Sequence, residues 1–75
     1  MKKIFLSTNI KHLRTLNKKT QEDIAELCGK KKTAVCNWEK GIREPNAVDI
    51  AILADYFKVS ADDLLTKNLS IETKK

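Results

Sequence analysis

The apolar residues of this chain recur at intervals of three and four positions, which is the period of an amphipathic helix. The clearest stripe consists of Ile50, Leu53, Ala54 and Phe57. No segment alternates apolar and polar residues over the length that a strand needs, and no internal repeat is present. The pattern therefore predicts an all-α fold, a compact bundle of five short helices.

The first predicted helix follows three good amino-terminal caps, Ser-Thr-Asn at positions 7–9. Its apolar stripe begins with Ile10 and Leu13 and continues with Leu16 or Asn17. A polar break then separates it from the next apolar segment.

The second and third predicted helices are short and lie on either side of Gly29. Thr20 begins the second helix, with Asp23 three positions on as a variant of the capping box, and Gly29 is placed to end it. The third helix runs from about 32 to 40 and stops at Gly41. The inward residues of the two helices are predicted to be Ile24, Leu27, Cys28, Val35 and Trp38.

A boundary at 44–46 (Glu-Pro-Asn) precedes the fourth helix, which carries the stripe described above. Ser60, with Asp63 as another capping-box variant, opens a brief fifth helix. Residues 66–75 are polar with scattered apolar positions. We therefore expect a domain over 1–65 and then a tail or the start of a linker.

The spacing of the second and third helices has two interpretations. Two short helices joined by a turn of about four residues match a helix-turn-helix. They also match an ordinary αα-corner, which many small helical proteins contain. Spacing alone leaves both open, so the residue types have to decide.

Five segments match the pattern of one known family. They are TQEDIAEL at 20–27, Gly29, NWEKG at 37–41, EPN at 44–46 and VSADDLL at 59–65. At these separations they resemble the Cro/CI-type helix-turn-helix of lambdoid phage repressors and restriction-modification controller proteins. The resemblance covers about residues 8–65. It implies a sequence-specific regulator of transcription that binds double-stranded DNA, with repression expected rather than activation.

The resemblance also implies roles for individual residues, with the third helix in the major groove. The residues that would meet base edges or nearby phosphates are Lys31, Lys32, Thr33 and Asn37. The residues that would hold the sugar-phosphate backbone are Gln21, Lys30, Lys40, Arg43 and Asn46. Gln21 also matches a residue that braces the recognition helix in relatives. Arg14 and Glu39 match a structural salt bridge between the first and third helices.

Three lysines depart from the family pattern. Lys19 and Lys30 stand where the family usually has apolar residues, and Lys31 stands where a small cap usually starts the third helix. The run 30–32 places three positive charges at a helix amino terminus, where the helix dipole opposes them. This arrangement indicates stability exchanged for affinity to phosphate, and a merely solvated charge run is the alternative.

The charge of the chain favours an anionic partner. Fifteen Lys and Arg against ten Asp and Glu give a net charge of +5. Residues 1–45 carry eleven basic and five acidic side chains, whereas 46–65 carry one basic and four acidic. We therefore expect the acidic segment to face away from the anion. Two alternatives stay open: an antitoxin-type module that binds a protein partner, and non-specific anion binding at a membrane surface.

The chain offers little chemistry for a metal, a cofactor or catalysis. Cys28 and Cys36 lie eight positions apart and the single histidine is His12, so no four-ligand zinc site is evident and we expect reduced thiols. No nucleophile–base arrangement, carboxylate pair or Gly-rich phosphate loop is present, which predicts no enzyme activity. We expect no cofactor, no small-molecule substrate, no membrane span and a cytoplasmic location in a bacterial cell or phage-infected host.

One domain of this size reads few base pairs, so we expect a homodimer on a pseudo-palindromic operator. The predicted dimer surface uses the fifth helix and the tail, through Leu64, Leu65, Leu69 and Ile71. The residues leave open the operator sequence. They also leave open whether the chain is complete or the amino-terminal domain of a longer repressor.

Overall fold

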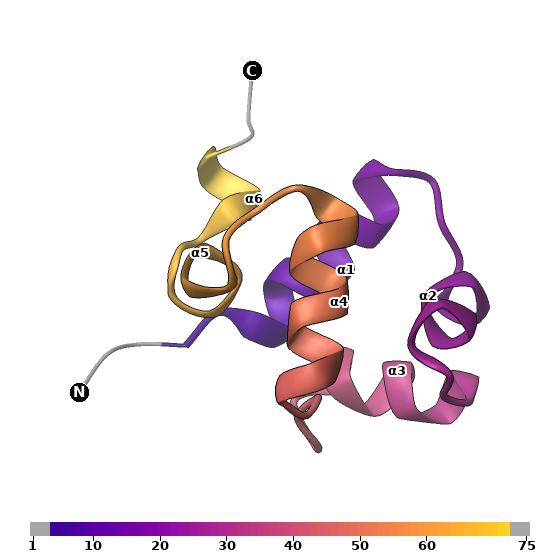
Figure 1. Cartoon of the computed structure of the whole chain (residues 1–75). Coiled ribbons are helices and arrows are strands. Elements are labelled where there is room, and N and C mark those ends of the chain that lie inside the picture. Colours follow the sequence, from indigo (N-terminus) through magenta and orange to yellow (C-terminus); the bar gives the residue numbers. More distant parts are fainter. Residues whose placement is uncertain (1–3, 73–75) are drawn as a thin grey trace.

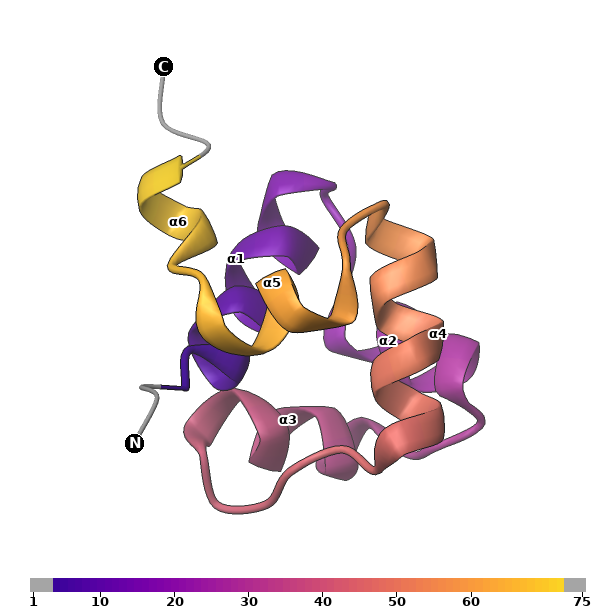
Figure 2. The same ribbon diagram turned by 60° about the vertical axis from the view of Figure 1, so that its left-hand side comes forward.

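Six helices follow one another in the computed structural model, which describes residues 4–72 and the side chains of 4–70. They are α1 (Leu6–Leu16), α2 (Gln21–Cys28), α3 (Lys32–Lys40), α4 (Ala47–Phe57), α5 (Ala61–Thr66) and α6 (Leu69–Glu72). Figures 1 and 2 place α3 at one end of the molecule and α6 at the other. No strand occurs within the described residues, so the predicted all-α class is confirmed, with one helix more than expected.

The core takes one fully buried side chain from each of the first five helices. These side chains are Ile10, Ile24, Val35, Leu53 and Leu64, each no more than 1% exposed. Helix α1 contacts α3, α5 and α6, while α4 contacts α2 and α5. Burying one such side chain stabilises the fold by about 1.5–3 kcal/mol. The shared centre therefore fixes the orientation of α3 relative to its neighbours.

Local hydrogen bonds at the helix ends confirm most of the predicted boundaries. The Thr20 hydroxyl accepts from the Asp23 amide and the Asp23 carboxylate accepts from the Thr20 amide, which is the predicted capping box at α2. Gly29 and Gly41 end α2 and α3 in the left-handed conformation, with φ of 67° and 76°. A second capping box, between Asn46 and Asp49 at the start of α4, was not predicted.

The start of α1 differs from the prediction. The helix begins at Leu6, with Phe5 at the N-cap position and no side-chain cap, instead of after residues 7–9. A distant contact fixes this start, because the Phe5 amide donates to the Leu65 carbonyl oxygen over 2.7 Å. Asn9, expected among the caps, is completely buried within the helix.

Two leucines that were predicted to face inward are at the surface. Leu16 at the end of α1 is 56% exposed, and Leu27 on α2 is 38% exposed. Ala25 is buried in α2 instead, beside Ile24 and Cys28. The inward face of α2 is therefore rotated slightly from the predicted stripe.

The expected tail begins with a turn of helix that packs on α1. The Asn9 side-chain nitrogen donates to the carbonyl oxygens of Leu64 and Lys67 over 2.7 and 2.6 Å. The Asn9 side-chain oxygen accepts from the Leu69 amide over 3.0 Å. One buried amide thus fastens the start of α6 to the bundle, and the division of the chain at residue 65 stays a prediction.

The predicted dimer surface is wrong at two of its four positions. Leu64 and Leu69 are 0% and 6% exposed, so the chain's own core encloses them. Leu65 is half-buried, and the side chain of Ile71 lies outside the described residues.

Candidate nucleic-acid interface

Helices α2 and α3 meet through the three-residue turn 29–31. The left-handed Gly29 lets the chain reverse, and the Lys30 amide then donates to the Ala25 carbonyl oxygen over 2.8 Å. A Cβ on Gly29 would meet no atom within 4 Å. Glycine is therefore favoured here by its left-handed backbone conformation and not by lack of space. The corner has the geometry that the helix-turn-helix spacing predicted.

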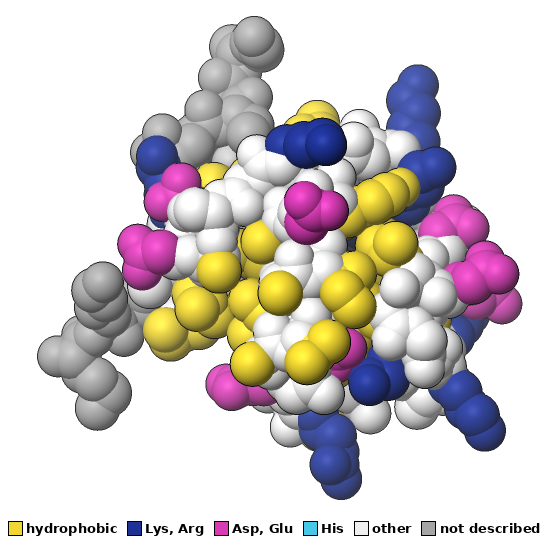
Figure 3. Space-filling view, viewed as in Figure 1, with side chains coloured by type: hydrophobic (Ala, Val, Ile, Leu, Met, Phe, Trp, Pro, Cys, Tyr) yellow, Lys and Arg dark blue, Asp and Glu magenta, His cyan; other side chains and the backbone are white. Residues whose placement is uncertain are grey.

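Helix α3 has a buried side and a polar exposed side. Val35 and Trp38 are 0% and 4% exposed and fix the helix to the core. The opposite side carries Thr33 and Lys40, and Lys32 lies on the flank at the start of the helix; all three are exposed. Lys and Arg side chains project in Figure 3 along the lower edge, where Figure 1 places α3 and the segment after it.

The amino terminus of α3 has no side-chain cap. Lys31 occupies the N-cap position with extended backbone and makes no cap hydrogen bond. The first turn contains no acidic residue, and Lys32 follows directly. Backbone N–H groups and positive side chains therefore meet at this end of the helix, where an anion would be favoured.

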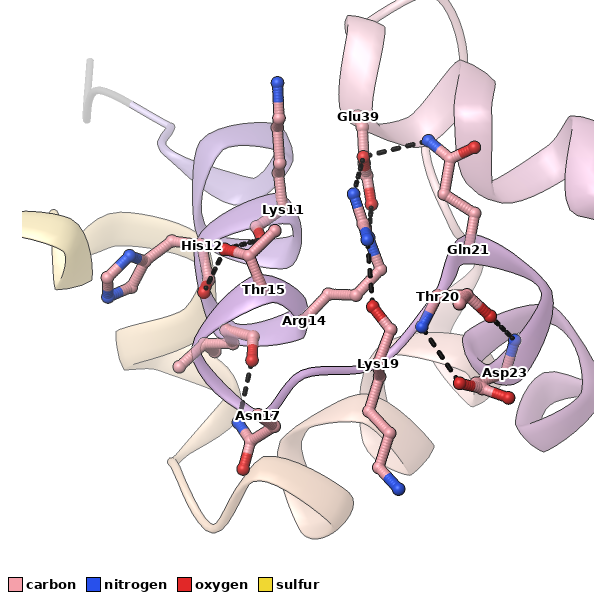
Figure 4. A network of polar contacts seen from close by, with 11 residues as sticks. Lys11, His12, Arg14, Thr15, Asn17, Lys19, Thr20, Gln21, Asp23 and Glu39 are labelled. Atoms are coloured by element: carbon pink, nitrogen blue, oxygen red, sulfur yellow. Dashed lines mark hydrogen bonds and ion pairs between the residues drawn. The ribbon is translucent and has the colours of Figure 1, made fainter.

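A polar network fixes the other end of α3. Arg14 donates to both Glu39 carboxylate oxygens, from Nε over 2.6 Å and from a terminal nitrogen over 3.1 Å. Gln21 Nε2 donates to the same carboxylate over 3.0 Å, and Arg14 also donates to the Lys19 carbonyl oxygen over 2.9 Å. Figure 4 shows Glu39 facing both partners. The hydrogen bond to Glu39 raises the pKa of Arg14 above its ordinary value.

The network makes Gln21 a bracing residue. Its amide holds Glu39 from the first position of α2, while Arg14 holds Glu39 from α1. Helix α3 is thus fixed by apolar contacts on its inner side and by hydrogen bonds at its end. A carboxylate shared by a guanidinium and an amide is a rigid arrangement.

Most of the predicted contact residues are exposed and belong to α3, to its N-cap position or to the segment that follows it. Lys31, Lys32, Thr33, Lys40, Arg43 and Asn46 are exposed, and Asn37 is partly exposed. The backbone carbonyl of Asn37 accepts from the amides of Ile42 and Arg43, so the loop after α3 folds back onto the helix.

Besides Gln21, two predicted contact residues, Asn46 and Lys30, have side-chain partners inside the chain. The Asn46 side-chain oxygen accepts from the Asp49 amide over 2.8 Å and caps α4. The Lys30 ammonium lies 3.6 Å from the Asp49 carboxylate. Sequence reasoning missed Asp49 because it was counted among the acidic residues of a solvated face, although its position three residues after Asn46 is a capping-box signal.

The two cysteines have different surroundings. Burial raises the pKa of the Cys28 thiol above its ordinary value, the Asp49 carboxylate adds to the rise and Lys30 opposes it. Cys36 is half-buried on α3, three residues after Thr33 and four before Lys40, and therefore lies near the exposed side of the helix. Both thiols are unpaired. Within the described residues, no group of three potential metal ligands occurs and no helix has the length and apolar character to cross a membrane.

Comparison with known proteins adds relatives to this geometry. The HTH-type transcriptional activator BcrR of Enterococcus faecalis is 35% identical over 57 residues, which are 76% of this chain and 28% of that protein. The chain thus spans less than a third of the length of this relative.

Solved structures share the fold over most of the chain. The P22 c2 repressor in complex with a synthetic operator has a TM-score of 0.77 and 26% identity, covering 83% of this chain and 94% of that one. The restriction-modification controller protein C.AhdI of Aeromonas hydrophila has a TM-score of 0.69 and 29% identity, covering 79% and 89%. These relatives do not favour the alternative of an antitoxin-type module.

The family model described as Helix-turn-helix matches residues 10–64, which is most of the chain. The match contains the α2–α3 corner, the exposed side of α3 and the Arg14–Glu39 network. The chain therefore belongs to the Cro/CI-type helix-turn-helix family.

Proposed function

We propose that the chain regulates transcription by binding double-stranded DNA, with α3 in the major groove. The observation that carries the proposal is the polar exposed side of α3, on a helix fixed from behind by Val35 and Trp38. Relatives with this fold support it, since one is a repressor in complex with an operator and another is a transcriptional activator. Regulation as a repressor is the form we propose.

The residue types on α3 suit the edges of base pairs. The ammonium of Lys32 can donate to guanine, the Asn37 amide can pair with adenine, and the Thr33 methyl group can contact thymine. Lys31 extends this set at the start of the helix. Gln21, Lys40, Arg43 and Asn46 are proposed to hold the phosphates on either side of the groove.

Selection of DNA sequences by the purified protein at a stated salt concentration tests the proposal. We expect Lys32→Ala, Thr33→Ala and Asn37→Ala each to lose discrimination at particular base pairs, by roughly 1–3 kcal/mol. Uniform weakening with an unchanged preferred sequence would contradict base recognition by α3 and leave electrostatic binding alone.

Lys58→Asn provides a matched control. It removes one positive charge at the end of α4 that lies farther from α3 in Figures 1 and 2. Lys58 has a left-handed φ of 62°, which asparagine adopts more readily than most residues. The control should keep both the preferred sequence and the affinity of the unaltered chain.

A homodimer on a pseudo-palindromic operator is part of the proposal. One α3 reaches only one half-site, and two half-sites one helical turn apart fit two copies related by a two-fold axis. Leu64 and Leu69 lie in the core, so Leu65 is the candidate for the dimer surface that remains among the side chains described by the structure. Sedimentation with and without operator DNA is expected to show two copies on DNA, and a monomer under both conditions would contradict this part. The cytoplasm is the compartment that we propose for such a regulator.

A further inference from the structure

An ion pair joins the turn between α2 and α3 to the start of α4. Lys30 Nζ lies 3.6 Å from Asp49 Oδ1. The Asp49 side chain is 3% exposed, whereas that of Lys30 is 38% exposed. A carboxylate so deeply buried needs a nearby positive charge, and Lys30 supplies it.

Further hydrogen bonds hold Asp49 in place. The Asp49 carboxylate accepts a hydrogen bond from the backbone N–H of Asn46 over 3.3 Å. The backbone N–H of Asp49 in turn donates to the side-chain oxygen of Asn46 over 2.8 Å. It stands in the first turn of α4, where the helix dipole favours a negative charge. Asp49 therefore cannot follow Lys30 toward solvent without disrupting the start of α4.

Lys30 is held at its backbone as well. Its amide donates to the Ala25 carbonyl oxygen over 2.8 Å, just after the left-handed Gly29. Cys28, at the end of α2, is buried, which raises the pKa of its thiol; the charge of Asp49 raises this pKa further and that of Lys30 lowers it. The turn between α2 and α3 and the first turn of α4 thus meet at one buried carboxylate.

We propose that Lys30 is a positioning residue, whose ammonium neutralises Asp49 and fixes the turn before α3 against α4, and that Lys30 does not bind a DNA phosphate. The part of the proposal that concerns DNA rests on the proposed function. The phosphates are held instead by residues such as Lys40 and Arg43, which are exposed. A phosphate that captured Lys30 would leave Asp49 as an unpaired buried charge.

The salt dependence of DNA binding distinguishes a positioning role of Lys30 from binding of a DNA phosphate by Lys30. Each phosphate contact contributes about 0.9 to the slope of log affinity against log salt. Lys30→Gln should leave the slope of the unaltered chain unchanged, while the matched variant Lys40→Gln, at an exposed residue proposed to hold a phosphate, should lower it by about 0.9 for each copy bound. An equal decrease for Lys30→Gln would overturn the proposal.

Thermal unfolding tests the ion pair without DNA. Lys30→Gln should lower the melting temperature by about 4–8 °C, because it leaves Asp49 unpaired. Lys30→Arg keeps the charge and should restore most of this loss. Asp49→Asn keeps the shape of the cap, so the double variant Lys30→Gln with Asp49→Asn should lose less than the sum of the two single variants. Additive losses would overturn the proposal.

A third measurement, the ratio of the affinities for operator and for unrelated DNA, reports on positioning, because a change in overall stability alone would not alter this ratio. At a temperature where both proteins are fully folded, Lys30→Gln should lower affinity for the selected operator several-fold more than affinity for unrelated DNA, and Lys30→Arg should restore the ratio. Equal weakening on both DNAs would overturn the positioning role. If the unaltered chain selects no sequence, the proposed function fails, while the unfolding cycle still decides whether Lys30 and Asp49 are coupled.

Discussion

At the scale of single residues, the carboxylate of Glu39 connects three helices. It belongs to α3 and receives hydrogen bonds from Arg14 on α1 and Gln21 on α2. The Glu39 side chain is 5% exposed and that of Arg14 is 13% exposed, so water competes little for either group. The orientation of the proposed recognition helix therefore depends on one buried negative charge.

Glu39→Gln should destabilise the fold by about 3 kcal/mol, because the change keeps the shape of the side chain but leaves Arg14 without a countercharge. This lies at the lower end of the range for buried pairs, since Arg14 retains some exposure. Urea unfolding measures the effect. Glu22→Gln, which alters an exposed residue of α2, is the control, and equal losses in the two variants would contradict the prediction.

The sequence is informative about such residues only where a motif marks them. The Arg14–Glu39 pair could be anticipated only from the family resemblance, because a separation of 25 positions in the sequence does not by itself indicate a contact. Asn9 and Asp49 are polar residues that looked like surface positions, yet both are buried. The partners of the Asn9 side chain lie 55 or more positions along the chain, so local patterns could not place it, whereas the capping-box spacing from Asn46 was a local signal for Asp49.

At the scale of elements, α6 depends on the Asn9 side chain. This short helix is held where Asn9 bonds the carbonyl oxygens of Leu64 and Lys67 and the amide of Leu69. Local signals did not predict it, because a single turn of helix is unstable without tertiary contacts. The same reason explains the early start of α1, which the Leu65 carbonyl oxygen fixes from α5.

Asn9→Ala should destabilise the chain by about 2–4 kcal/mol, since it removes hydrogen bonds to three backbone groups, two of them buried and one partly buried. The loss should be accompanied by faster amide hydrogen exchange at Leu69, while Ile24 in α2 stays protected. Exchange followed by NMR measures both. Unchanged exchange at Leu69 would show that α6 does not depend on Asn9.

The uncapped start of α3 predicts opposite effects on stability and binding. Lys31→Ser should stabilise the fold by about 1 kcal/mol, because serine can accept a hydrogen bond from the first turn of α3. The same change removes a positive charge and should weaken DNA binding. Thermal unfolding and a DNA titration on the same sample measure the two effects, and a gain in both would contradict an exchange of stability for affinity.

At the scale of the whole molecule, the helices and most of their boundaries followed from periodicity and caps. The exposed side of α3 followed as well, because Val35 and Trp38 mark the opposite side. The dimer surface did not follow, since a leucine that could face a partner looks the same in the sequence as one that closes the core. Leu64 and Leu69 proved to be of the second kind.

The gathering of positive side chains around α3 predicts strong salt dependence. A dimer with about 6–10 phosphate contacts should lose about 10³–10⁵-fold in operator affinity between 50 and 200 mM salt. Titrations at several salt concentrations measure the slope. Lys58→Asn should leave this slope unchanged, and an affinity that is independent of salt would contradict phosphate binding at this surface.

The unequal surroundings of the two thiols make Cys36 a natural chemical probe of α3, the proposed recognition helix. Cys28 is buried with a raised pKa, whereas Cys36 is half-buried near the polar side of α3. A mild alkylating reagent should therefore modify Cys36 first, because thiolates rather than thiols react. Operator DNA over α3 should slow that modification, and mass spectrometry would follow it, with Cys36→Ser as the control. Occupancy of the groove could then be footprinted on the unaltered chain, without any added label.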